Sequence, residues 1–340
     1  ELNGAAADGE NVIGKTIEDY KILCRDYTVS LDNLQRVWEA KLEPVFPCRI
    51  KTTDTTPETY SNANRIQRSA SIKVAQPRVL IPVFPGTNCE YDTARAFERA
   101  GAKAETIVIR NLSASAIEES VNVFERAIKQ SQIIMLPGGF SGGDEPEGSG
   151  KFITAFFRNA KIKDAVHDLL QNRDGLMLGI CNGFQALVKL GLVPFGEIID
   201  MADDAPTLTF NTIARHQSMM VTTRIASNKS PWLYGCEVGD IHTIPISHGE
   251  GRFVAPDRII QQMANNGQIA TQYVDLDGNP TMDIRYNPNT SVEAIEGITS
   301  PDGRVLGKMG HSERIGSFVG KNVPGSKDQK IFESGVAYFK

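Results

Sequence analysis

Residues 78–191 alternate between short apolar runs and amphipathic segments. The apolar runs predict strands over residues 79–84, 105–110, 132–136 and 176–180. The amphipathic segments predict helices over residues 91–100, 115–129, 151–172 and 183–191. The segment over 151–172 can form either one helix or two shorter ones. Strands that alternate with helices favour a parallel sheet with helices on both faces. The pattern therefore predicts an α/β domain whose functional residues follow the carboxyl ends of the strands.

The pattern changes on either side of this region. After residue 207 it is mostly β, with predicted strands over 207–212, 219–225, 243–247, 269–274, 291–298 and 304–309 and a final helix over 329–339. Before residue 77 it predicts one amphipathic helix over 31–42, followed by a polar linker over 51–77. We therefore expect an N-terminal segment over 1–76 that packs on something else, and a main domain over 77–340.

Composition and charge exclude several classes of protein. The net charge is −5 without a dense basic block, so no electrostatic surface for nucleic acid is expected. No apolar run approaches the ~20 residues that a membrane span needs. The chain begins at Glu1 without a secretory signal, which is typical of a fragment or a processed piece. The five cysteines are scattered, which argues against a disulfide framework or a zinc site and favours the reducing cytoplasm.

Residues 176–185 carry the most specific local signal. An apolar strand leads through Gly179 to Cys181, and Gly183 follows at the start of a helix. This is the order of a nucleophile elbow, with sulfur in place of the hydroxyl. The glycines permit a sharp turn, and a helix N-terminus favours the thiolate. The segment predicts Cys181 as a nucleophile; the alternative is a buried structural cysteine, a common place for this residue type.

A cysteine nucleophile needs a base and a carboxylate that orients the base. The chain contains two His-x-Glu triplets, at residues 248–250 and 311–313. In an extended segment the side chains at i and i+2 point the same way, so either triplet can supply both groups. The spacing by itself does not choose between them. The remaining histidines, His167, His216 and His242, have weaker contexts.

Acyl chemistry also needs hydrogen-bond donors for the oxyanion that develops. The backbone N–H of Asn182 follows the nucleophile directly and is one candidate. A second candidate is the glycine turn at Gly138 and Gly139, at the end of the neighbouring predicted strand, because glycine permits close approach of the backbone to a ligand. The alternative is that these glycines only form a tight turn.

These motifs together resemble a known family. Residues 179–185 look like the nucleophile motif of class I, triad-type glutamine amidotransferases. Residues 85–90, 137–141, 247–252 and 311–314 are similar to motifs in the glutaminase domain of phosphoribosylformylglycinamidine synthase. The similarity covers about Arg78 to Phe339 and implies a flavodoxin-like fold with a mostly parallel sheet. It also implies that residues 1–76 are the tail of the synthetase region, plus a linker, of the large single-chain form.

The resemblance implies roles for individual residues. It assigns Cys181, His311 and Glu313 to a catalytic triad, and the N–H groups of Gly139 and Asn182 to the oxyanion hole. The substrate contacts that it implies are Gln185, Ser247, His248 and Gly249. The chain departs from the family at Ser312, where a proline that would stiffen the loop is common. It also departs at residues 211–213, to which no role is assigned.

The implied activity is hydrolysis of glutamine through a cysteinyl thioester to glutamate and ammonia. The ammonia would pass to an ATP-dependent synthetase region that converts formylglycinamide ribonucleotide to formylglycinamidine ribonucleotide in purine biosynthesis. The expected partners are glutamine and that region, with no nucleic acid or membrane. No cofactor or metal is expected on this chain, and ATP and Mg²⁺ are expected in the synthetase region.

Three alternatives remain open from the sequence. Another Cys-elbow α/β hydrolase, peptidase-like or deglycase-like, would have no reason to keep Gln185 and the loop at His248. A non-catalytic binding module would be expected to lose the triad, which is complete here. A glutaminase that supplies a different acceptor is disfavoured by the run at residues 247–252.

Overall fold

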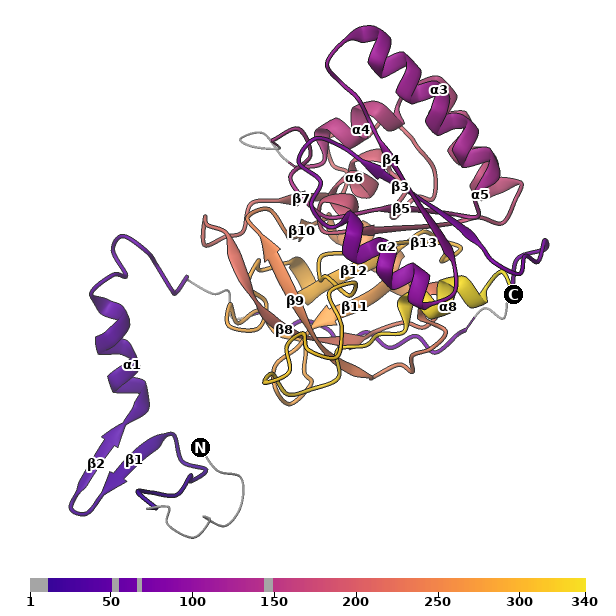
Figure 1. Ribbon diagram of the computed structural model, residues 1–340. Helices are drawn as coiled ribbons and strands as arrows, with labels where there is room; N and C mark the ends of the chain where they lie inside the picture. The colour runs from indigo at the N-terminus through magenta and orange to yellow at the C-terminus, as the bar shows by residue number, and fades with distance from the viewer. Residues whose placement is uncertain (1–11, 51–54, 66–68, 144–148) are drawn as a thin grey trace. The chain divides into compact units, whose positions relative to one another are not determined.

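The computed structural model describes residues 12–50, 55–65, 69–143 and 149–340. It divides into two compact units, Glu1–Ile50 and Lys51–Lys340, which are described separately. In the smaller unit, the antiparallel hairpin of β1 (Lys21–Cys24) and β2 (Tyr27–Ser30) leads directly into helix α1 (Leu31–Ala40) (Figure 1). The helix confirms the prediction, whereas the hairpin was not predicted. None of the side chains of α1 is buried.

The larger unit is built on one nine-stranded sheet (Figure 1). Its strands, in spatial order, are β4 (Lys103–Val108), β3 (Arg78–Val83), β5 (Ile133–Leu136), β6 (Leu176–Ile180), β13 (Val305–Lys308), β12 (Ile295–Thr299), β11 (Ile269–Tyr273), β8 (Gln217–Ile225) and β9 (Ile241–His248). The first five strands are parallel, and the others continue the sheet antiparallel. The β-rich C-terminal half therefore extends the α/β sheet, because β13 returns beside β6. A separate pair is formed by β7 (Thr207–Thr209) and β10 (Arg252–Val254).

Helices cover both faces of the parallel part, as predicted. The helices of the larger unit as a whole are α2 (Glu90–Arg99), α3 (Ala114–Gln130), α4 (Lys151–Phe157), α5 (Ala160–Gln171), α6 (Asn182–Leu190), α7 (Asp257–Asn265) and α8 (Ile331–Ala337). One group contains α3, α4, α5 and α6, and α2 packs with α8 (Figure 1). No described helix is both long and apolar enough to cross a membrane.

Two parts of the predicted β-rich half are not strands. Helix α7 lies where the sequence was interpreted as mostly β, and it buries Ile259, Ile260 and Met263 on one face. The predicted strand over 291–298 begins as a 3₁₀ turn, and only Ile295–Thr299 pairs in the sheet. In both places the sequence contains a short apolar run. Such a run is compatible with the buried face of a helix as well as with a strand.

The boundary between the two compact units falls after residue 50, inside the predicted N-terminal segment. The described parts of the predicted linker lie against the larger unit, where Tyr60 is buried. The N–H of Asn62 donates to the carbonyl of Ala226 at 2.8 Å, and that of Ala70 to the carbonyl of Tyr338 at 3.0 Å. This polar segment therefore satisfies its backbone through tertiary hydrogen bonds, which local periodicity does not reveal. Residues 1–11, 51–54 and 66–68 of the predicted N-terminal segment lie outside the described residues.

Candidate active site

The predicted elbow forms at the end of the parallel strand β6. Strand β6 ends at Ile180, Cys181 makes the turn, and α6 begins at Asn182. Cys181 has φ 53° and ψ −108°, a strained conformation for a residue with a Cβ. Such strain is kept where the surrounding structure requires it, typically at functional sites. The N–H of Cys181 donates to the carbonyl of Lys308 on β13 at 2.9 Å, which fixes the backbone of the turn.

The glycines on either side of Cys181 are required by packing. A Cβ at Gly179 would lie 2.5 Å from Leu187 Cδ1, and a Cβ at Gly183 would overlap the carbonyl oxygen of Leu136. Helix α6 therefore rests directly on strands β5 and β6, and only glycine permits that approach. The close contact fixes the start of α6 against the ends of the two strands.

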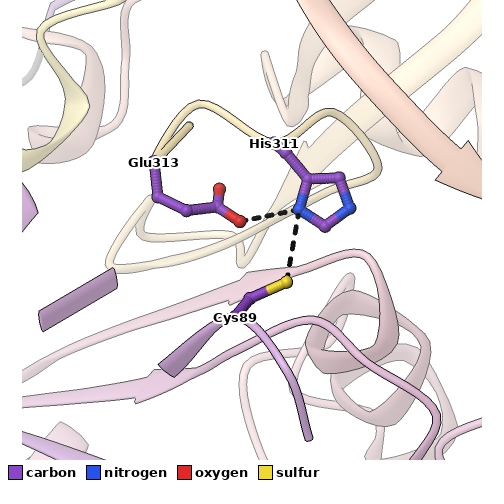
Figure 2. A group of neighbouring side chains, drawn as sticks. All are labelled: Cys89, His311 and Glu313. Atoms are coloured by element: carbon purple, nitrogen blue, oxygen red, sulfur yellow. Dashed lines mark hydrogen bonds and ion pairs between the residues drawn. The ribbon is translucent and has the colours of Figure 1, made fainter. Parts of the chain in front are cut away.

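His311 and Glu313 form a buried hydrogen-bonded pair in the loop after β13. His311 Nδ1 lies 2.6 Å from Glu313 Oε1, and both side chains are almost fully inaccessible (Figure 2). Because Nδ1–H donates to the carboxylate, Nε2 is left for the nucleophile. A Cβ placed on Gly138 would lie 2.7 Å from His311 Cε1 and 3.4 Å from Cys181 Cβ. The structure therefore brings Cys181, His311 and Glu313 together around the end of β5.

The charges in this group stabilise one another. Burial by itself would lower the pKa of His311, but the Glu313 carboxylate and the Cys181 thiolate outweigh it and hold that pKa well above its usual value. Burial likewise would raise the pKa of Glu313, but His311 lowers it overall.

A second buried cysteine, Cys89, lies beside the same histidine (Figure 2). Its Sγ is 3.9 Å from His311 Nδ1 and 3.1 Å from Arg314 Nη2. Cys89, His311 and Glu313 are residue types that bind metals, but ligands of one tetrahedral zinc ion lie about 3.3 Å apart. The separation of 2.6 Å between His311 and Glu313 is that of a hydrogen bond, so the group is arranged for proton transfer. The sequence places Cys89 only in the motif at residues 85–90 and does not predict its contact with His311.

The two predicted oxyanion donors lie at the ends of neighbouring strands. Gly139 follows β5 with φ 142°, a conformation that favours glycine, and Asn182 is the first residue of α6. Two backbone hydrogen bonds flank Gly139, from Phe140 N–H to the carbonyl of Gly86 at 2.9 Å and from Asn88 N–H to the carbonyl of Gly138 at 3.3 Å. Neither bond uses the N–H of Gly139, which is the group that the prediction requires.

Gln185 and Ser247 connect the nucleophile to the loop that follows β9. The Gln185 side-chain amide donates to the carbonyl of Glu250, and its oxygen accepts from Asn182 Nδ2 at 3.0 Å. The carbonyl of Ser247 lies 3.7 Å from Cys181 Sγ, and its hydroxyl lies 2.9 Å from His216 Nε2. His216 thus contacts a predicted substrate residue, although its sequence context is weaker than those of the two triplets.

The other His-x-Glu triplet does not form an acid–base pair. Glu250 Oε2 accepts from the N–H of Ser149 at 2.8 Å, while His248 Nδ1 lies 3.2 Å from Asn211 Oδ1. Burial lowers the pKa of His248 to about 3, so this imidazole is neutral. Of the two triplets, only His311 and Glu313 therefore form a histidine–carboxylate pair.

Asn211 holds the loop that contains His248 and Gly249, although the sequence assigned residues 211–213 no role. Asn211 Nδ2 donates to the carbonyl of His248 at 2.8 Å, and its N–H donates to the carbonyl of Gly249 at 2.8 Å. Asn211 Oδ1 accepts from Gly251 N–H at 3.2 Å. An asparagine supplies a donor and an acceptor at once, so its side chain fixes two peptide groups of the loop while its backbone N–H binds a third. A candidate cavity of about 280 Å³, lined by Glu58–Asn62 and part of α7, contains none of the predicted site residues.

Replacing His248 by glutamine is expected to reduce the acid sensitivity of the fold. Below pH 6.5 this histidine is protonated in the unfolded chain but stays neutral in the folded chain. Its contribution to the free energy of unfolding is therefore fully present above pH 6.5 and is lost as the pH falls toward about 3. Between pH 7.5 and 5.5 the wild type should lose about 1.4 kcal/mol more unfolding free energy than His248→Gln. Urea titrations at both pH values measure this difference. Equal losses in the two proteins would contradict a neutral, buried His248.

The comparisons with known proteins agree with this geometry. The model of the CobB/CobQ-like glutamine amidotransferase domain matches residues 76–339. The chain is 38% identical over 247 residues to the phosphoribosylformylglycinamidine synthase subunit PurQ of Methanococcus maripaludis strain C7, covering 72% of this chain and 84% of the relative. It is 32% identical over 246 residues to the same subunit of Aquifex aeolicus strain VF5, covering 72% and 92%.

A solved structure gives the same result. In the structure of PurLQS from Thermotoga maritima, one chain is 27% identical with a TM-score of 0.56, and the match covers 78% of this chain and all of that one. The family model spans most of the sheet, the elbow at Cys181 and the loop at His311. The chain therefore belongs to the CobB/CobQ-like glutamine amidotransferase family.

Proposed function

We propose that this chain hydrolyses glutamine to glutamate and ammonia at Cys181 and that the ammonia is used to make formylglycinamidine ribonucleotide in purine biosynthesis. The observation that carries the proposal is the buried His311–Glu313 pair beside a cysteine in a nucleophile elbow. The substrate class is supported by the PurQ relatives, which are subunits of phosphoribosylformylglycinamidine synthase.

The proposed mechanism starts with attack of the Cys181 thiolate on the carboxamide carbon of glutamine. The N–H groups of Gly139 and Asn182 stabilise the oxyanion. His311, oriented by Glu313, donates its proton to the leaving nitrogen, so that ammonia departs and a glutamyl thioester remains. A water molecule then gives a proton to His311 and attacks the thioester, which releases glutamate and restores the thiolate. In this scheme Gln185 and the loop at Ser247, His248 and Gly249 form the wall of the glutamine site.

The proposed partner is a synthetase that uses ATP and Mg²⁺. The relatives reported above are subunits, so the synthetase is either a separate chain or a region joined to residue 1 of this one. The family match covers residues 76–339 and does not include the segment before them. Covalent linkage, as in the large single-chain form, therefore remains a prediction. A cytoplasmic location also remains a prediction. Ammonia is protonated rapidly in water and then loses its nucleophilicity, so a closed path between the two sites would be needed.

Covalent labelling with a glutamine-mimicking electrophile tests the proposal. Mass spectrometry is expected to find the adduct on Cys181 in the wild type and a greatly reduced adduct in His311→Ala. His248→Ala should weaken labelling only at low reagent concentration, because that loop is proposed to bind substrate. An adduct on a different cysteine, or equal labelling in His311→Ala, would contradict the assignment. Adding the synthetase partner to an unlabelled sample distinguishes a wrong assignment from an enzyme that needs its partner.

A further inference from the structure

A buried ion pair lies beneath the loop that carries His311. Lys308 Nζ, on β13, is 3.2 Å from Glu296 Oε1, on the neighbouring strand β12, and the two side chains are 1% and 0% exposed. Buried pairs of this kind are often no more stabilising than apolar residues of the same volume. Stability by itself therefore does not explain why Lys308 and Glu296 are buried here. The hydrogen bonds that the two side chains make to the loop suggest another role.

Both members of the pair bind Gly310, the residue before His311. Glu296 Oε1 accepts from the N–H of Gly310 at 2.6 Å, and Lys308 Nζ donates to the carbonyl of Gly310 at 2.8 Å. A Cβ on Gly310 would lie 3.0 Å from Glu296 Oε1 and would overlap Ile244. The peptide groups on both sides of this glycine are thus fixed by two opposite charges that have no access to solvent.

Lys308 also binds the residue after His311. Its Nζ lies 3.0 Å from Ser312 Oγ, and the Ser312 hydroxyl donates to Gln329 Oε1. The family resemblance implies a proline at position 312, which would stiffen this loop by its ring. In this chain the hydroxyl of Ser312 connects the loop to Lys308 and to Gln329, and these hydrogen bonds restrict it in another way.

The backbone of the same lysine binds the nucleophile. The carbonyl of Lys308 accepts the N–H of Cys181 at 2.9 Å, and Lys308 pairs with Ile180 in the parallel register of β13 and β6. We infer that Lys308, with Glu296 as its partner, is a positioning residue that sets the distance between Cys181 and His311. The inference rests on the proposed function, and it assigns to this reaction a pair of residues outside the triad.

Removing the ammonium group is expected to slow catalysis without weakening substrate binding. In Lys308→Met the loop at residues 310–312 loses two hydrogen bonds, and Glu296 loses its ion-pair partner. A misplacement of about 1 Å between reacting groups can cost about 100-fold in rate, so kcat should fall by about 10- to 100-fold. KM for glutamine should change by less than about threefold, because the proposed substrate contacts lie on α6 and around the end of β9.

The double variant Lys308→Met/Glu296→Gln separates positioning from stability. Lys308→Met alone leaves a buried carboxylate without a counter-charge, which destabilises the fold and can prevent folding. Adding Glu296→Gln removes that charge, so the melting temperature should recover. In contrast, kcat should stay low because the bonds from Lys308 Nζ to the Gly310 carbonyl and the Ser312 hydroxyl are still absent. Recovery of both quantities would overturn the inference and leave the pair a structural role alone.

Arg304→Met is the matched control. Arg304 is also a buried cation next to β13, but it binds Asp174 and Asp302 away from the triad. The substitution Arg304→Met is expected to lower the free energy of unfolding and to leave kcat unchanged.

Amide hydrogen exchange provides a readout that does not depend on activity. The amides of residues 310–312 should exchange faster in the double variant than in Arg304→Met. Unchanged exchange would overturn the inference. A wild type without glutaminase activity, in the presence of its synthetase partner, would instead contradict the proposed function while the exchange result still tested the positioning by Lys308.

Discussion

Replacing Cys181 by serine is expected to lower glutamine hydrolysis by about 10⁴-fold or more, because loss of the nucleophile removes the covalent path. The substitution keeps the volume of the side chain, so the strained turn at φ 53° should still form. The hydroxyl lacks the thiol's acidity, and the imidazolium at His311 cannot accept its proton. Steady-state production of glutamate, measured with and without the synthetase partner, tests this expectation.

Cys236→Ala is the control for this experiment. Cys236 is as buried as Cys181, but burial raises the pKa of its thiol to about 12, and its Sγ donates to the carbonyl of Gln329 at 2.9 Å. It lies outside the proposed mechanism, so its removal should leave kcat unchanged. Substantial glutaminase activity in Cys181→Ser would show that the thiol is not the nucleophile and would remove the basis of the proposed function.

Replacing Glu313 by glutamine is expected to lower kcat/KM by about 10²- to 10⁴-fold, by analogy with other triads in which the orienting carboxylate is neutralised. Glu313 and the Cys181 thiolate together hold the pKa of His311 well above its usual value against the effect of burial. The imidazolium therefore persists above pH 6.5 in the wild type. Without the carboxylate that pKa falls, so activity should begin to decline at a lower pH on the alkaline side.

The measurement is kcat/KM against pH for the wild type and Glu313→Gln. Glu237→Gln is the control, because Glu237 is a largely exposed carboxylate that pairs with Arg65 and lies outside the proposed site. An alkaline limb at the same pH in the wild type and Glu313→Gln would mean that Glu313 does not set the protonation of His311.

The sequence determined the parallel half of the sheet and the elbow. These features depend on near neighbours in the chain: apolar runs, helical periodicity, and the glycines at 179 and 183 that let α6 rest on the strands. It also limited the base to two triplets, because the i and i+2 positions of an extended segment share a face.

Tertiary structure decided what depends on residues far apart in the chain. It paired His311 with a carboxylate near Cys181, whereas His248 is neutral and lies against Asn211. It also attached residues 55–65 to the larger unit and placed Cys89 against His311.

The pair of Lys308 and Glu296 shows the limit most clearly. Each is an ordinary charged residue in the sequence, and nothing local predicts that either is buried. Their contact arises because β12 and β13 are neighbours, and their hydrogen bonds to Gly310 arise because the loop bends back over the strand ends. Local pattern reports the propensity of a segment, whereas the pairing of buried polar groups depends on which segments meet, and this only the folded chain decides.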